Sequence, residues 1–189
     1  MKILTVVLSF NSKKYIGECL DSLSKTKTDI LIVDGGSTDN SQEFLKDFIK
    51  GSPFKREGGP LLKLIETNKN LGYAGGNNVG LRYALENNYD FVWIVNPDIV
   101  VDSKALDEAI KVMTKDRNTA VVASKVYFAP GYEFHKNRYS KKEIGKVLWY
   151  SGGENDWKNV FAIHYGMNEV DKGQYDKEKE VGFATGSSM

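Results

Sequence analysis

The chain has 189 residues, of which 41% are hydrophobic and 27% charged, with 26 Lys and Arg against 25 Asp and Glu. This balance is typical of a globular protein of one domain and excludes extensive disorder. A net charge of +1 gives no basic surface for nucleic-acid phosphates, so we expect no nucleic-acid partner. The single cysteine excludes an internal disulfide and a multi-cysteine zinc site.

Four segments are continuously apolar and rich in branched residues, a pattern that predicts strands buried on both faces. They are residues 3–8, 30–33, 61–65 and 91–95. Residues 120–126 have the same composition and are predicted as a fifth strand. The first segment ends at Ser9 with no small-residue cleavage site, which favours a strand over a signal peptide. The single Cys19 fits a reducing cytoplasmic location.

Apolar stripes with helical spacing lie between these segments, and Ser103 is a predicted N-cap for the last helix. The stripes fall within residues 15–23, 44–49, 81–85 and 106–113. Alternating strands and helices predict an α/β fold in which residues 1–128 form a mostly parallel, doubly wound, Rossmann-like sheet. Residues 129–189 break this rhythm and predict a smaller, partly antiparallel extension of the same domain.

Polar residues follow each of the first four predicted strands. They stand in the segments Ser9-Phe10-Asn11, residues 34–39, residues 68–78 and Asn96-Pro97-Asp98. Each set alone is typical of a turn or a helix cap. Because ligands of open α/β sheets bind outside the carboxyl ends of the strands, four such sets at one edge predict a binding site there.

The chemistry of this edge favours an anionic ligand. Gly72, Gly75 and Gly76 permit close backbone approach, and a helix predicted to begin near Asn77 offers free N–H groups to anionic oxygen. The spacing is neither the dinucleotide fingerprint nor a P-loop. Asp98 suits a hard divalent cation that also takes substrate phosphates. A pair of unit charges at 4 Å is worth about 4 kcal/mol at an effective dielectric near 20, and a divalent ion on a diphosphate exceeds this.

Asp34 has two interpretations. As a carboxylate that leaves a buried strand, it can accept hydrogen bonds from a ribose hydroxyl or a base N–H. It can equally serve as an N-cap or form an Asx-turn.

In chain order these motifs resemble those of the inverting family 2 glycosyltransferases of GT-A fold, and in particular their rhamnosyltransferase-like branch. The matching segments are TVVLSFN (5–11), IVDGGSTDNS (32–41), NLGYAGGNNVG (70–80), VNPD (95–98) and GFATGSSM (182–189). The resemblance implies a bacterial enzyme of polysaccharide assembly that uses a nucleoside-diphosphate sugar, Mg²⁺ or Mn²⁺, and a saccharide or lipid-linked acceptor.

The resemblance also implies roles for individual residues. Ser9, Phe10 and Asn11 would line the nucleotide pocket, Asp34 would hold the base or ribose, and Asp98 would bind the metal. The full expected nucleotide-sugar-binding set is Ser9, Phe10, Asn11, Asp34, Gly72, Gly76, Asn77, Asn78, Asn96 and Asp98.

Two positions depart from the family pattern. Gly35 stands where many relatives have Asp or Asn, and Asn96 replaces the first Asp of an Asp-x-Asp metal motif. The Asn-Pro-Asp form is frequent in the rhamnosyltransferase-like branch, which favours dTDP-rhamnose as donor and leaves a UDP-sugar as an alternative.

The implied reaction is a single displacement at the anomeric carbon with inversion, and it needs a general base for the acceptor hydroxyl. In the family this base follows the Thr-Gly-rich strand, and the present sequence ends at Met189 within that motif. We therefore expect a truncated enzyme and assign no base. The alternative is a nucleotide-sugar-binding fragment or pseudoenzyme. A sugar nucleotidyltransferase is less favoured, because it would carry a Gly-rich basic segment where Ser9-Phe10-Asn11-Ser12 stands.

A basic cluster, residues 136–146, contains Lys136, Arg138, Lys141, Lys142 and Lys146. Such a cluster is usually a solvated face. Its functional alternative is attraction to anionic lipid or to a lipid-diphosphate acceptor, which would place the protein at the inner face of the membrane.

Overall fold

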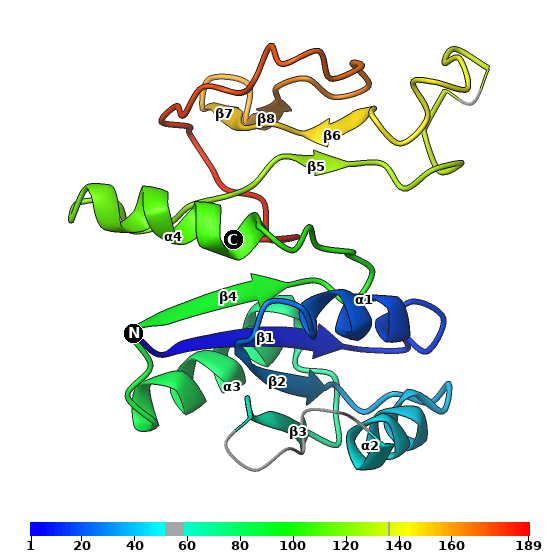
Figure 1. The fold of residues 1–189 in the computed structure, drawn as a ribbon, viewed down its shortest axis with the longest axis vertical. Coiled ribbons are helices and arrows are strands. Elements are labelled where there is room, and N and C mark those ends of the chain that lie inside the picture. Colours follow the sequence, from blue (N-terminus) through cyan, green and yellow to red (C-terminus); the bar gives the residue numbers. More distant parts are fainter. Residues whose placement is uncertain (52–58, 136) are drawn as a thin grey trace. The chain divides into compact units, whose positions relative to one another are not determined.

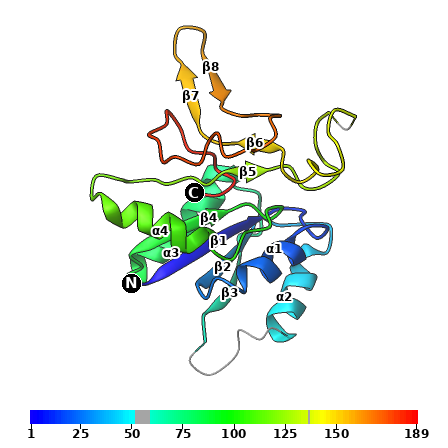
Figure 2. The same cartoon turned by 45° about the horizontal axis from the view of Figure 1, so that its top comes forward.

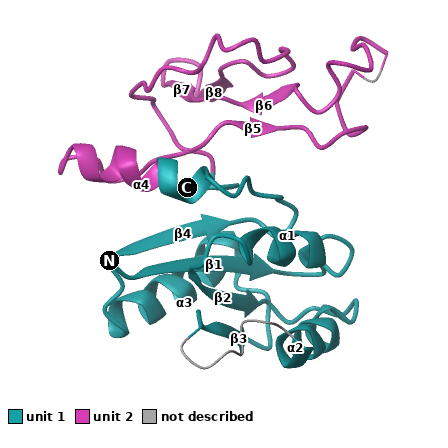
Figure 3. Cartoon of the chain, viewed as in Figure 1, with its two compact units in different colours: residues 1–108, 186–188 teal, residues 109–185, 189 magenta. Residues whose placement is uncertain are grey.

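The computed structural model describes residues 1–51, 59–135 and 137–189. Lys136 of the predicted basic cluster lies outside the described residues. The chain forms two compact units, one of residues 1–108 with 186–188 and the other of residues 109–185 with Met189 (Figure 3). Residues 186–188, near the end of the sequence, thus belong to the first unit. The boundary expected at residue 128 stays a prediction.

The first unit contains alternating strands and helices (Figure 1). In chain order they are β1 (Ile3–Ser9), α1 (Ile16–Leu23), β2 (Asp29–Asp34), α2 (Ser41–Gly51), β3 (Leu62–Glu66), α3 (Gly72–Glu86) and β4 (Phe91–Val95). Helix α4 (Ala105–Lys115) follows and continues into the second unit. The four predicted strands and the four predicted helices are therefore all present.

The four strands form one parallel sheet in the order β3-β2-β1-β4. Thr5 of β1 lies between Ile30 of β2 and Trp93 of β4. The chain moves outward on one side of β1 through β2 and β3 and then crosses to the other side for β4. This reversal opens a crevice at the carboxyl ends of β1 and β4, which is where ligands of such sheets bind.

Helices cover both faces of this sheet (Figure 2). On one face Leu4, Val6, Leu31 and Val33 form a buried cluster with Ala84 of α3. Helix α1 covers the other face and buries a stripe that consists of Ile16, Cys19, Leu20 and Leu23. Burial on both faces explains why the central strands β1 and β2 are continuously apolar and why the pattern predicted them.

The second unit contains short antiparallel pairs. Strand β5 (Val126–Tyr127) pairs with β6 (Leu148–Tyr150), and β7 (Gly153–Asp156) pairs with β8 (Phe161–His164). The partly antiparallel extension is thus confirmed. Lys125 cross-links this unit through ion pairs of 2.7 Å to Asp171 and 2.6 Å to Asp176. Among the described helices, none has the length and apolar character that a membrane span requires.

The structure corrects three local predictions. Residues 120–125 are not a strand, because no described strand lies beside them to share hydrogen bonds. Of the fifth predicted segment only Val126 is paired, in β5. Helix α3 begins at Gly72, five residues before the predicted start at Asn77. The side chain that accepts a backbone N–H before α4 is Asp102, from Lys104 at 2.8 Å, and not the predicted cap Ser103.

Candidate functional site

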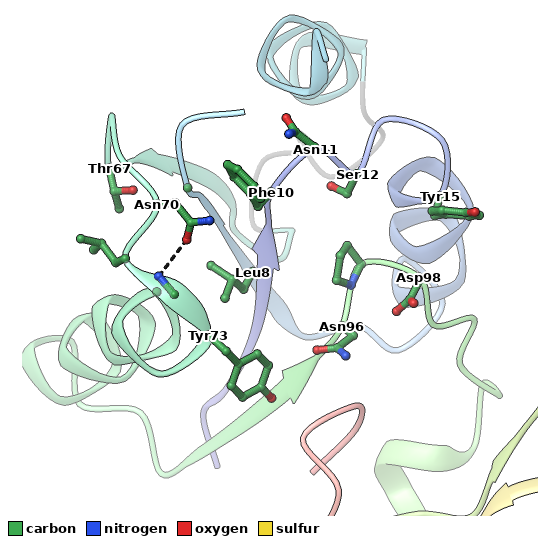
Figure 4. Close-up of a pocket in the computed structure, with 15 residues that line it drawn as sticks. Leu8, Phe10, Asn11, Ser12, Tyr15, Thr67, Asn70, Tyr73, Asn96 and Asp98 are labelled. Atoms are coloured by element: carbon green, nitrogen blue, oxygen red, sulfur yellow. Dashed lines mark hydrogen bonds between the residues drawn. The ribbon is translucent and has the colours of Figure 1, made fainter. Parts of the chain in front are cut away.

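A pocket of about 430 Å³ opens in the first unit at the carboxyl ends of β1 and β4 (Figure 4). Its walls come from the loop after β1, the segment from β3 into α3, and the turn after β4. The lining residues are Leu8, Phe10, Asn11, Ser12, Tyr15, Gly35, Thr67, Asn70, Leu71, Gly72, Tyr73, Gly76, Asn96, Pro97 and Asp98. Six of the ten predicted site residues are among them, namely Phe10, Asn11, Gly72, Gly76, Asn96 and Asp98.

The loops after β1 and β2 are held together by Asn11. Its side-chain oxygen accepts a hydrogen bond of 2.8 Å from the Thr38 N–H, and its own N–H donates to the Ser37 hydroxyl at 2.9 Å. The neighbouring Phe10 ring is 46% exposed and lies against Gly35. An exposed aromatic ring at the edge of a pocket suits stacking on a planar base or on a sugar ring.

Asp34 and Ser9 are fully buried and do not line the pocket. The Asp34 side chain is fully buried and accepts hydrogen bonds from the N–H groups of Gly36 and Ser37, the Ser37 and Ser9 hydroxyls, and the Gln42 amide. Burial alone would raise the pKa of Asp34, but the bonds from Ser37, Gln42 and Ser9 hold this pKa below its usual value. Asp34 therefore forms an Asx-turn, through the hydrogen bond from the Gly36 N–H to its side chain.

The start of α3 forms one wall of the pocket. Gly72, the first helical residue, has a φ of +71°, and its N–H donates to the Asn70 side-chain oxygen at 2.8 Å (Figure 4). Asn70 thus fixes the chain as it enters the helix. Because the first N–H groups of a helix have no partner within it, this wall presents the positive end of a 15-residue helix dipole to the pocket.

The two asparagines further along α3 lie elsewhere. Asn77 is 4% exposed, and its amide donates to the Tyr73 carbonyl at 3.0 Å. Its side-chain oxygen is buried with no hydrogen-bond partner in the described part of the chain. Asn78 is exposed and is not a lining residue. Their approach to the sugar of a nucleotide stays a prediction.

The turn after β4 carries the one carboxylate of the pocket lining. The Ile99 N–H donates to the Asn96 carbonyl at 3.2 Å and closes the turn, while Asp98 projects as an exposed side chain. No group of three or more His, Cys, Asp or Glu within the described residues could enclose a metal ion. Asp98 and the Asn96 amide carry oxygen donors of the kind that Mg²⁺ and Mn²⁺ take together with substrate phosphates and water. A metal ion held by them stays a prediction.

Several lining residues were not in the predicted set. Tyr15 was assigned to an apolar helical stripe, yet it lies just before α1 and is 41% exposed. Tyr73 and Thr67 also line the pocket. A sequence signal for Tyr73 was present, since it stands inside the glycine-rich segment that was expected to meet the ligand.

The chain belongs to glycosyl transferase family 2, whose family model matches residues 5–170. All residues that line the pocket lie within that match. The GT-A-like, mostly parallel sheet predicted from the sequence is thus confirmed together with the family.

Curated relatives match parts of the chain. One is an uncharacterized protein of Methanocaldococcus jannaschii, 25% identical over 66% of this chain and 52% of its own length. Another is the low-salt glycan biosynthesis hexosyltransferase Agl10 of Haloferax volcanii, 26% identical over 53% of this chain and 34% of its own. A teichoic acid poly(glycerol phosphate) polymerase of Staphylococcus epidermidis is 29% identical over 42% of this chain and 11% of its own.

Among solved structures, residues 1–349 of TarS from S. aureus resemble this chain. The complex with UDP has a TM-score of 0.50 and 26% identity over 66% of this chain and 38% of that chain. The complex with UDP-GlcNAc also has a TM-score of 0.50 and 26% identity, over 66% of this chain and 37% of that chain. The chain thus spans about half or less of the length of the relatives that it matches.

Proposed function

We propose that this chain is the donor-binding part of a glycosyltransferase that takes a sugar from a nucleoside diphosphate. The observation that carries the proposal is the pocket at the β1/β4 crevice, which combines exposed aromatic rings, a helix N-terminus and a single carboxylate, Asp98. A planar base, an anionic diphosphate and a metal ion need these three features. The UDP and UDP-GlcNAc complexes of TarS support the same ligand class.

The charge of the pocket supports a metal-dependent mode of binding. Of its fifteen lining residues none is Lys, Arg or His, and Asp98 contributes a negative charge. Among the groups of the pocket wall, a diphosphate would therefore meet repulsion from Asp98, which the α3 dipole offsets in part. Mg²⁺ or Mn²⁺ held by Asp98, with Asn96 beside it, would neutralise the diphosphate and stabilise it as the leaving group.

We further propose transfer with inversion to a saccharide or lipid-linked acceptor in the synthesis of a cell-surface polysaccharide. The names of Agl10 and of the teichoic acid polymerase support a role in glycan assembly. For the donor, the Asn96-Pro97-Asp98 turn favours dTDP-rhamnose, whereas the TarS complexes favour a UDP-sugar. Phe10, the Asn11 loop and Asp98 would orient either donor, and no residue is assigned as the base.

A second candidate is nucleotide-sugar binding without transfer. It is favoured by one observation, namely that Asp98 is the one carboxylate among the lining residues of the described pocket. If Asp98 holds a metal, no other lining group is an ordinary general base.

Thermal unfolding with UDP, dTDP or GDP, each with and without Mn²⁺, tests the donor site. At a ligand concentration of 100 Kd, binding adds about 2.7 kcal/mol of stability, and each kcal/mol raises Tm by about 2–4 °C in a protein of this size. We expect this shift for one nucleoside diphosphate, and only with metal. If none of the three nucleoside diphosphates raises Tm in a metal-dependent way, the donor site is contradicted. Release of UDP or dTDP from the matching sugar nucleotide, measured with the same protein, separates a transferase from a binding protein.

A further inference from the structure

The segment 186–188 lies beside β4 and belongs to the same unit as the pocket. Ser188 forms an antiparallel bridge with Val95, and its hydroxyl accepts a hydrogen bond of 3.1 Å from the Trp93 indole N–H. The Asn96 N–H donates to the Ser187 carbonyl at 2.9 Å. The backbone of a pocket residue, Asn96, is therefore fixed by the far end of the sequence.

Tyr73 reaches the same segment from the opposite wall of the pocket. Its hydroxyl donates a hydrogen bond of 2.5 Å to the Gly186 carbonyl, and Figure 4 shows its ring directed from α3 to the side on which Asn96 lies. A Cβ atom on Gly186 would lie 2.3 Å from this hydroxyl, so that the close approach requires glycine. Partial burial raises the pKa of Tyr73, which keeps the hydroxyl protonated and able to donate.

These contacts form a continuous path from one wall of the pocket to the other. It runs from Tyr73 to Gly186, along the chain to Ser187, and across to Asn96 at the base of the turn that carries Asp98. We propose that Tyr73 is a positioning residue whose hydroxyl seats segment 186–188 and thereby orients the Asn96–Asp98 turn for the donor. The part of this inference that concerns the donor rests on the proposed function.

Replacement of Tyr73 by phenylalanine tests the inference because it removes the hydroxyl and keeps the ring. Two measurements need no ligand, namely the amide exchange of Asn96 and the indole N–H resonance of Trp93. A hydrogen bond contributes about 1 kcal/mol, so we expect Asn96 to exchange roughly 5-fold faster in Tyr73→Phe, with a shifted Trp93 resonance. Tyr83→Phe, the same change on the same helix outside the pocket lining, should leave both signals unchanged.

The third measurement is the affinity for UDP or dTDP with Mn²⁺, which we expect to fall roughly 5-fold in Tyr73→Phe. An unchanged Asn96 exchange rate and Trp93 resonance would overturn the seating role, and an unchanged affinity would overturn the role in orienting the turn. If the unmodified protein binds no nucleoside diphosphate, the proposed function fails, while the measurements without ligand still decide whether Tyr73 seats the segment.

A variant of Gly186, the other partner in the contact, tests the inference independently if Tyr73→Phe fails to fold. In Gly186→Ala the new Cβ must displace the Tyr73 hydroxyl, so we expect the same rise in Asn96 exchange. Since part of that clash disappears with the hydroxyl, Gly186→Ala should have a smaller effect in the Tyr73→Phe background than alone. Equal effects in the two backgrounds would overturn the direct contact.

Discussion

The thiol of Cys19 donates a hydrogen bond of 3.5 Å to the carbonyl oxygen of Asn96. Helix α1 thereby touches the turn that carries Asp98, from the side of the sheet opposite α3. Cys19 is 1% exposed, as its place on the apolar stripe of α1 predicted. The backbone of Asn96, which begins the turn after β4, is thus fixed by two hydrogen bonds, one from the Cys19 thiol to its carbonyl and one from its N–H to the Ser187 carbonyl.

The Cys19 thiol should be unreactive in the folded protein. Burial, with a smaller contribution from the charge of Asp98, raises its pKa to about 12, so that almost no thiolate forms at pH 8. We expect no labelling by a thiol reagent such as 5,5′-dithiobis(2-nitrobenzoic acid) at pH 8, and one equivalent per chain in 6 M guanidinium chloride. Rapid labelling without denaturant would show that α1 and the turn are not packed as described.

The Asp98 carboxylate should carry the metal-dependent part of nucleotide binding. We expect Asp98→Asn to weaken the Mn²⁺-dependent binding of UDP or dTDP by roughly 10- to 100-fold, about 1.4–2.8 kcal/mol, because a full negative charge is lost. Binding without metal should change little or improve, since repulsion of the diphosphate is removed. Isothermal titration with and without Mn²⁺ measures both quantities.

Asp107→Asn is a matched control, since Asp107 is exposed in the first turn of α4 and is not a lining residue. It should retain the metal-dependent affinity of the unmodified protein. The assignment of Asp98 is contradicted if Asp98→Asn and Asp107→Asn bind the nucleotide equally well in the presence of Mn²⁺.

Gly80 allows α3 to lie close to β1. A Cβ atom at this position would stand 2.5 Å from Cγ1 of Val6, a fully buried and stiff β-branched side chain. We expect Gly80→Ala to destabilise the protein, because overpacking that costs about 1–3 kcal/mol outweighs the helix propensity that alanine gains. Urea unfolding followed by circular dichroism measures the change. The matched variant Arg82→Ala, at an exposed position of the same helix, should leave the free energy of unfolding nearly unchanged. A Gly80→Ala variant that is as stable as the unmodified protein, or more stable, would refute the close approach of α3 to β1.

The parts of the fold that could be predicted are those with a strong local pattern. Strands β1 and β2 are buried on both faces and β4 is partly buried, so that their continuous apolar runs are visible without knowledge of their neighbours. Strand β3, at the edge of the sheet, is only half-buried and includes the exposed Lys63. Residues 120–125 have the same composition but no strand beside them in the described chain. Pairing is a property of two segments, and a pattern in one of them cannot supply it.

The site shows the same distinction. That Phe10, Asn11, Asn96 and Asp98 line one pocket could be predicted, because they follow strands whose carboxyl ends meet at one edge. Asn77 could not be placed, because its role depends on where α3 begins, and the glycines at 72, 75 and 76 suggested a loop where the structure has a helix. Contacts of high sequence separation, such as Trp93 with Ser188, have no local signal at all.

Asp34 should give the protein an acid-sensitive stability. Its hydrogen bonds hold the folded-state pKa below the unfolded value, so its contribution is complete above the unfolded pKa of about 3.9 and is lost as the pH falls toward the folded pKa. At pH 7 we expect Asp34→Asn to lower the free energy of unfolding by about 1–3 kcal/mol, since buried donors lose a charged acceptor. The difference in the free energy of unfolding between the unmodified protein and this variant should shrink between pH 4 and pH 2.

Urea unfolding at pH 7, 4, 3 and 2 measures this difference. The control is Asp21→Asn, a change at an exposed position of α1, whose effect on the free energy of unfolding should remain near zero at every pH. A difference that stays constant down to pH 2 would mean that the Asp34 carboxylate is not stabilised by these bonds.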